Sequence, residues 1–71
     1  MIRSQHDIAI GMLEGYVDRV SDQECSAIAV NASAGTAIPI FRSLGVISAA
    51  EDSHYTERVS RAYERRQGKT A

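Results

Sequence analysis

Apolar residues recur at intervals of three and four along the first part of the chain, which is the spacing of one side of an α-helix. The apolar positions of residues 4–20 are Ile8, Ile10, Met12, Leu13, Tyr16, Val17 and Val20. At 100° per residue they cover about half of the helix circumference, whereas a helix that covers one side of a core needs a stripe of roughly 100°. The remaining arc carries the acidic residues Asp7, Glu14 and Asp18. The pattern predicts a first helix with more apolar surface than one contact requires.

Two polar residues and a glycine frame a second predicted helix, over residues 21–34. Ser21 is followed three residues later by Glu24, the spacing of a capping box in which each side chain binds a free backbone N–H. Gly35 is a residue type favoured just after a helix ends. One side of this helix carries mostly small residues, which allow close packing on a neighbour: Cys25, Ile28, Ala29 and Ala32.

A third, short helix is predicted over residues 37–44. Thr36 can serve as its N-cap, Pro39 falls within the first turn, and Gly45 follows the last residue as a terminator. The residues expected to join the core are Ile38, Ile40, Phe41 and Leu44.

The central region has a second interpretation as a β-hairpin. Residues 27–31 and 36–41 would pair around a turn at residues 32–35. Alanine is a poor strand former, and Pro39 would need a position on a sheet edge. The helical interpretation is therefore preferred, and the hairpin stays open as its alternative.

A fourth helix is predicted over residues 48–67. Ser48 and Glu51 form a second capping-box pattern. Acidic residues are also favourable here, because the N-terminus is the positive end of the helix dipole. Gly68 ends the helix, and residues 68–71 are expected to form a frayed tail. The apolar stripe is narrow and consists of Tyr55, Val59, Ala62 and Tyr63.

These elements predict a single all-α domain spanning residues 1–71. Its expected architecture is a compact four-helix arrangement with two longer terminal helices and two short central ones. A chain of 71 residues buries only about 60% of its unfolded surface, so small scaffolds need an additional source of stability. A disulfide within the chain is excluded because Cys25 is the only cysteine. No metal or cofactor is expected, since His6, Cys25 and His54 are widely separated.

Oligomerisation and close helix packing are the remaining sources of stability, and the first helix indicates where an association would occur. Ile8, Ile10 and Met12 fall near the margins of its wide apolar arc. Exposed apolar patches on proteins usually mark contacts, so we expect a second copy or a partner protein to cover this excess. The alternative is that the other helices of the same chain wrap the arc completely.

The last helix carries a basic stripe, formed by His54, Arg58, Arg61 and Arg65 at spacings of four, three and four. It could dock on a nucleic-acid backbone, on an acidic protein groove, or on the acidic stripe of a second copy. The alternative is a solvated face with Glu57 and Arg61 as an i,i+4 ion pair. Residues 1–35 hold five acidic and two basic residues and residues 36–71 hold four and six, so the halves carry −3 and +2.

Other functional classes receive little support. The net charge of −1 disfavours a dedicated nucleic-acid binder, and a helix-turn-helix placed at Gly45 would put Glu51 and Asp52 against phosphates. The chain contains neither a P-loop nor a Gly-x-Ser-x-Gly motif. A nucleophile–base pair of Cys25 and His54 is less favoured than a structural thiol, because Cys25 lies in a predicted apolar helix. No enzymatic activity is expected.

The sequence therefore predicts a small helical protein–protein interaction module that acts as a regulator, adaptor or inhibitor, as a homodimer and with an unidentified protein partner. The residues expected to bind protein are Leu13, Tyr16, Val17, Tyr55, Tyr63, Arg58, Arg61 and Arg65. The alternative is a small nucleic-acid-binding transcriptional regulator that uses the C-terminal arginines. No targeting segment and no run of about 20 apolar residues occurs, so a cytoplasmic protein without membrane contact is expected. Its small size suits a bacterial or phage origin.

Overall fold

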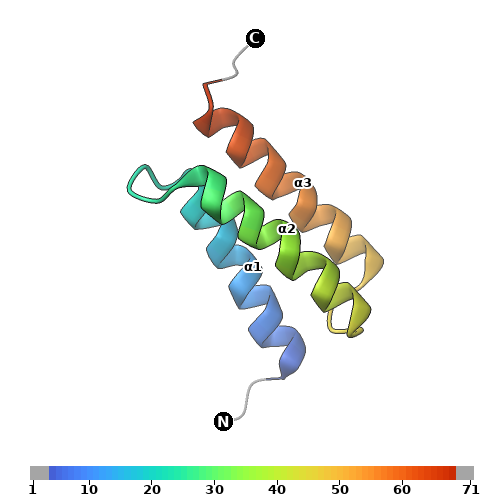
Figure 1. The fold of residues 1–71 in the computed structure, drawn as a ribbon. Coiled ribbons are helices and arrows are strands. Elements are labelled where there is room, and N and C mark those ends of the chain that lie inside the picture. The colour runs from blue at the N-terminus through green and yellow to red at the C-terminus, as the bar shows by residue number, and fades with distance from the viewer. Residues whose placement is uncertain (1–3, 69–71) are drawn as a thin grey trace.

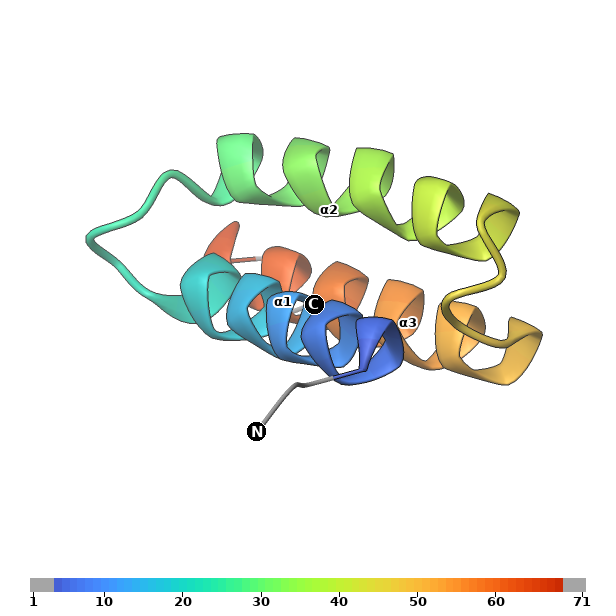
Figure 2. The same ribbon diagram turned by 90° about the horizontal axis from the view of Figure 1, so that it is seen from below.

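The computed structural model describes residues 4–68, and these form three helices: α1 (Gln5–Ser21), α2 (Ala27–Ser43) and α3 (Ala49–Arg66). α1 and α3 run in one direction and α2 runs back along them (Figure 1). Each helix packs on the other two, with α2 on one side of the α1–α3 pair and its outer side open (Figure 2). The predicted all-helical fold is confirmed. The prediction of four helices is wrong, because the two predicted central helices form a single helix, α2.

The predicted capping box at Ser21 does not form. Ser21 is the last residue of α1, and the turn that follows is set by Asp22, whose carboxylate accepts a hydrogen bond from the backbone N–H of Glu24 at 2.9 Å. The N-cap of α2 is instead Ser26, whose hydroxyl accepts from the N–H of Ala29 at 3.2 Å. The second helix therefore begins six residues later than its predicted start at residue 21.

α2 continues through both residues that were expected to break it. Gly35 lies inside the helix rather than after it, and Pro39 is an interior residue. A proline in a helix interior removes one backbone hydrogen bond, and a glycine weakens the helix by about 1 kcal/mol. Packing on α1 and α3 outweighs both effects, because Ala34 and Ile38 beside them are buried. The hairpin alternative for residues 27–41 is wrong.

Gly35 in the middle of α2 and Gly45 just after its end should respond in opposite ways to alanine. Gly35 is exposed, has helical geometry and has open space where a Cβ would go, so we expect Gly35→Ala to stabilise the fold by about 0.5–1 kcal/mol. Gly45 has a φ of +72°, so we expect Gly45→Ala to destabilise it by about 1 kcal/mol. Urea denaturation of both variants checks this. A loss of stability in Gly35→Ala would mean that α2 is not continuous there.

The predicted start of α3 is confirmed. Ser48 is the N-cap, its hydroxyl accepts from the N–H of Glu51 at 3.1 Å, and the Glu51 carboxylate accepts from the N–H of Ser48 at 2.8 Å. The helix ends at Arg66, close to its predicted end, and Gly68 follows with a φ of +70°. The rest of the predicted frayed tail, residues 69–71, lies outside the described residues.

Two clusters of buried residues hold the helices together. The larger contains Ala9, Leu13, Ile38, Ile47 and Tyr55, and the smaller contains Val20, Ala27 and Ala62. The small cluster lies at the end of the bundle where α1 ends and α2 begins, and its two alanines let the helices approach closely. Leu13 and Val20 are the largest side chains that are fully enclosed.

Arg66 fastens the last turn of α3 to the loop between α1 and α2. Its guanidinium donates hydrogen bonds to the backbone carbonyls of Val20, Asp22 and Cys25. These are carbonyls at and beyond the C-terminus of α1, which have no partner inside that helix. One side chain thus ties three parts of the chain together at this end.

Candidate functional site

The three pairs of helices leave three different faces. The α1–α3 face is charged and the α1–α2 face is apolar. The α2–α3 face mixes small, apolar and polar side chains with an ion pair of Arg42 and Asp52 at 3.3 Å. The predicted binding residues lie mostly along the α1–α3 face, and the exposed apolar residues lie mostly on the α1–α2 face.

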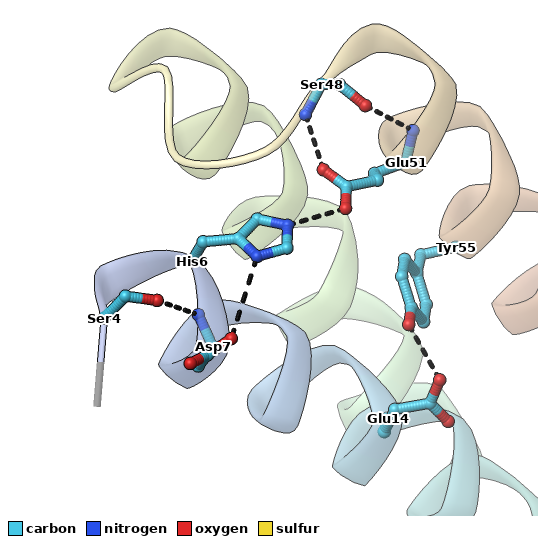
Figure 3. A network of polar contacts seen from close by, with 7 residues as sticks. All are labelled: Ser4, His6, Asp7, Glu14, Ser48, Glu51 and Tyr55. Atoms are coloured by element: carbon cyan, nitrogen blue, oxygen red, sulfur yellow. Dashed lines mark hydrogen bonds and ion pairs between the residues drawn. The ribbon is translucent and has the colours of Figure 1, made fainter. Parts of the chain in front are cut away.

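The charged face is organised around Glu14. Its carboxylate accepts two hydrogen bonds from the Arg58 guanidinium, at 2.7 and 3.1 Å, and one from the Tyr55 hydroxyl at 2.7 Å. Figure 3 shows Tyr55 of α3 reaching across to Glu14 of α1. The Arg58 guanidinium also lies 5.4 Å from the centre of the Tyr55 ring. The acidic stripe of α1 and the basic stripe of α3 therefore meet within one chain, where the sequence suggested that they could meet between two.

These contacts change the protonation of the groups involved. The Arg58 guanidinium, followed by the Tyr55 hydroxyl, lowers the pKa of Glu14 below its ordinary value of 4.5. Burial, followed by the hydrogen bond to Glu14, raises the pKa of Tyr55 above its ordinary value of 10.0. Both shifts favour the protonation states that form this network, so the network is a structural link between α1 and α3.

A second polar link joins the start of α1 to the start of α3. His6 Nε2 lies 2.6 Å from a carboxylate oxygen of Glu51, the residue that also completes the capping box at Ser48 (Figure 3). The backbone N–H of Ser48, followed by His6, lowers the pKa of Glu51. His6 Nδ1 lies 3.9 Å from the Asp7 carboxylate. Glu51 therefore caps its own helix and holds a neighbouring one.

We expect the fold to lose stability in acid. Glu14 and Glu51 both have pKa values below the ordinary 4.5, so the folded chain binds fewer protons than the unfolded chain as the pH falls past that value. The stabilisation is complete above about pH 5 and is lost as the pH drops through the lowered pKa values. Urea midpoints measured from pH 7 to pH 3 should therefore fall. Glu14→Gln should flatten this dependence, and Glu64→Gln, on the exposed side of α3, should leave it in place.

Two of the three arginines predicted to bind a partner already hold carboxylates. Arg58 binds Glu14, and Arg61 binds Glu57, which confirms the i,i+4 pair. A shallow depression brings together Val17, Arg58, Arg61 and Arg65 between α1 and α3. Because carboxylates neutralise much of its charge, this stripe is a weaker anion-binding surface than the sequence suggests. Its role in binding nucleic acid or protein stays a prediction.

The apolar residues predicted to bind a partner divide between core and surface. Leu13 and Tyr55 are buried in the larger cluster, so their side chains hold the monomer together. Tyr16 and Val17 are half-buried against the same cluster, and Tyr63 is half-buried against the smaller one. The predicted set therefore does not form one surface.

The apolar surface lies elsewhere, on α1 and above all on α2. The large apolar side chains left exposed among the described residues are Ile8 (49%), Met12 (43%), Ile28 (67%), Ile40 (49%) and Leu44 (70%). Ile8 and Met12 are margin residues of the first helix, so the predicted excess of apolar surface remains uncovered there. Ile10, the third margin residue, is partly buried against the core.

Ile40 and Leu44 were expected in the core and are instead exposed. A separate short helix over residues 37–44 could rotate about its own axis to point these side chains into the core. In a continuous α2 each residue turns by about 100°, so Ile40 and Leu44 point away from the buried Ile38. Phe41 lies between these directions and packs partly against the core.

A groove of about 340 Å³ runs between the first half of α1 and the end of α2. We call it the α1–α2 groove; it is lined by Gln5, Ile8, Ala9, Met12, Phe41, Leu44 and Val46. None of these side chains is ionisable. A second groove of about 270 Å³ lies between α2 and α3. Its apolar lining includes Ala34, Ile38 and Val59, and its polar lining residues are Asn31, Asp52, Thr56 and Ser60.

One sequence signal could have identified this surface. Residues 27–41 contain no charged side chain, although they form most of a helix that has one side in the open. A surface helix normally carries charged and polar residues on its outer side, so a helix without charges there indicates that a partner covers it. That reading requires residues 27–43 to be one helix, and the expected break at Gly35 concealed it.

The structure keeps apart Cys25 and His54, the two residues that the sequence offered as a nucleophile–base pair. Cys25 lies in the loop before α2 and His54 in the second turn of α3, at opposite ends of the bundle (Figure 1). His54 makes an edge-to-face contact with Tyr55, with ring centres 4.9 Å apart. Within residues 4–68, no three His, Cys, Asp or Glu side chains come together as metal ligands would.

Comparison with known proteins does not identify a relative. No protein-family model matches the chain, and no curated protein or solved structure matches it either. In residues 4–68 there is also no helix with the length and hydropathy needed to span a bilayer. The surface of the helix bundle is therefore the evidence for function.

Proposed function

We propose that this chain is a small helical protein–protein interaction module, without enzymatic activity, that forms a homodimer and acts on another protein as a regulator, adaptor or inhibitor. The observation that carries the proposal is the open side of α2. The helix and its C-cap residue expose Ile28, Ile40 and Leu44, with Ile28 turned about 160° away from Leu44 around the helix axis. No charged residue occurs from position 27 to position 41.

Leaving the side chains of Ile28, Ile40 and Leu44 in water forgoes the free energy that their burial would contribute. Fully burying one leucine or isoleucine side chain stabilises a protein by about 1.5–3 kcal/mol. A domain of this size has few residues with which to cover its own helices, and none of the other helices reaches the outer side of α2 (Figure 2). A contiguous exposed apolar surface usually marks a contact with another macromolecule.

The exposed residues fall into two groups along α2, and we assign them different occupants. Leu44, Ile40 and the α1–α2 groove lie near the end of α2 and would be covered by the second copy. Ile28 is the second residue of α2, at the other end, and would remain available to the target protein. This division lets one chain dimerise and bind a target at the same time.

The oligomeric state in solution tests the proposal. Sedimentation equilibrium at several concentrations should give twice the 7.7 kDa of one chain. Ile40→Lys, which places a charge on the open side of α2, should shift the protein towards the monomer. The control Ser53→Lys, at an exposed position of α3, should leave the dimer unchanged.

Binding to a target is tested separately. Immobilised wild-type protein and an Ile28→Lys variant would be compared for proteins captured from the native host, identified by quantitative mass spectrometry. The proposal expects a protein that is retained by the wild type and depleted with the variant. A monomer at the highest concentration, together with no such difference in capture, would refute it.

A further inference from the structure

The α1–α2 groove and the most exposed large apolar side chain of the described chain lie on the same face. Leu44 is 70% exposed and stands at the rim of the groove, one helical turn after the exposed Ile40. The groove is open, and its lining is apolar except for Gln5. A projecting side chain and a receptive groove are therefore adjacent.

We propose that the groove is occupied by Leu44 of a second copy of this chain, and that the two copies exchange Leu44 reciprocally about a two-fold axis. This inference rests on the proposed function, because it specifies the geometry of the dimer. Each groove is incomplete alone, and the second copy supplies the side chain that fills it.

The symmetry of the contact favours a second copy over an unrelated protein. In a two-fold interface the same surface patch serves both partners, so the patch must contain both a projection and a depression that fits it. Leu44 and the groove meet this condition on a single patch. The volume also fits, because a cavity of about 150 Å³ holds one benzene-sized apolar group and the groove offers about 340 Å³. The second copy's Leu44 and part of its Ile40 would fill it.

The charges support the same occupant. Two copies related by a two-fold axis bring identical side chains near one another, and like charges in such a contact repel. The residues that line the groove carry no charge, whereas the α1–α3 face carries Glu14, Arg58 and Glu51. An acidic or basic partner would find no opposite charge in the groove. A neutral and apolar surface, such as this face itself, fits it best.

The available area is also sufficient. A standard interface covers about 800 Å² on each partner, which is about one sixth of the 4888 Å² that this chain exposes. The outer side of α2 together with the α1–α2 groove can supply an area of about this size. The contact would bury Ile8, Met12, Ile40 and Leu44, and it would leave the exposed Ile28 outside.

Disulfide trapping between differently labelled chains tests this geometry. Both chains carry Cys25→Ser, one also carries Leu44→Cys, and the other carries Met12→Cys. Because each chain then has a single cysteine, a disulfide between positions 44 and 12 can only join two molecules. We expect this mixed disulfide to form at least about tenfold faster than the control pair of Leu44→Cys with Ile28→Cys. Equal rates for the two pairs would overturn the inference.

Sedimentation of a Leu44→Ala variant gives a second measurement that does not depend on new cysteines. Each copy loses a buried leucine, and every 1.4 kcal/mol is a tenfold change in affinity. The dimer dissociation constant should therefore rise by about 100-fold or more, while circular dichroism stays that of a folded helical protein. A wild-type dimer that Leu44→Ala does not weaken would refute the reciprocal insertion and leave the proposed function standing. A wild-type protein that is monomeric at every concentration would refute the insertion and the homodimer of the proposed function, and the capture experiment would still test binding to a target.

Discussion

Replacing Leu13 by alanine should destabilise the fold by about 2–5 kcal/mol. Leu13 has no exposed surface and lies in the larger core cluster between Ala9, Ile38 and Tyr55. Truncation of a fully buried leucine removes its transfer free energy and leaves a cavity that the surroundings only partly fill. Single domains of this size have little stability to lose. We therefore expect a large fraction of Leu13→Ala to be unfolded at 37 °C, as measured by circular dichroism during urea and thermal denaturation.

The matched control is Ile28→Ala, which also truncates a branched apolar side chain in a helix. Ile28 is 67% exposed, so its truncation leaves no internal cavity and should change the denaturation midpoint little. The comparison also distinguishes two roles for Leu13, which the sequence alone suggested as a binding residue. If Leu13→Ala were as stable as Ile28→Ala, its side chain could not be the centre of the core.

Replacing Tyr55 by alanine should destabilise the fold by about 3–5 kcal/mol. The Tyr55 ring is buried in the same cluster, and truncation of a buried aromatic side chain has a cost of this order. The substitution also removes the hydroxyl that donates to Glu14 at 2.7 Å. Urea denaturation at pH 7 measures the free energy of unfolding.

A Tyr55→Phe variant separates the ring from its hydroxyl. It keeps the ring in the core and removes only the hydrogen bond to Glu14, whose network remains partly exposed to water. We expect a smaller loss, of about 1 kcal/mol. Equal losses in the two variants would show that the ring contributes no packing, contrary to its burial. Unchanged stability in Tyr55→Ala would restore Tyr55 as a candidate surface anchor.

The boundaries predicted correctly from the sequence are those set by local chemistry. Ser48 and Glu51 form their capping box within one turn, and Gly45 adopts the left-handed conformation that its neighbours require. Such signals act over three or four residues and need no knowledge of the rest of the fold. The end of α2 and the start of α3 could therefore be predicted.

The middle of the chain could not be predicted in this way, because distant contacts decide it. Gly35 and Pro39 are both local signals for a break, and α2 nevertheless passes through them, supported by the burial of Ala34 and Ile38 against the neighbouring helices. Tertiary packing commonly overrides local preference by this route. The Ser21–Glu24 pattern failed for a related reason, since Ser21 already belongs to α1.

The exposure of the candidate surface could be predicted only for α1, where the apolar pattern of a single helix decides which side chains stay uncovered. The width of the apolar arc on α1 indicated that Ile8 and Met12 would remain uncovered, and they are exposed. The exposure of Ile40 and Leu44 depends on the phase of α2, which the assumed break at Gly35 made wrong. The tyrosines and Leu13 were assigned to binding by residue type, whereas the three-dimensional fold places Leu13 and Tyr55 inside.

The position of Arg66 has a consequence for how the chain matures during synthesis. Its guanidinium holds the carbonyls of Val20, Asp22 and Cys25, residues that leave the ribosome more than forty positions earlier. Until the final turn of α3 emerges, the connection between the first two helices lacks its fastening.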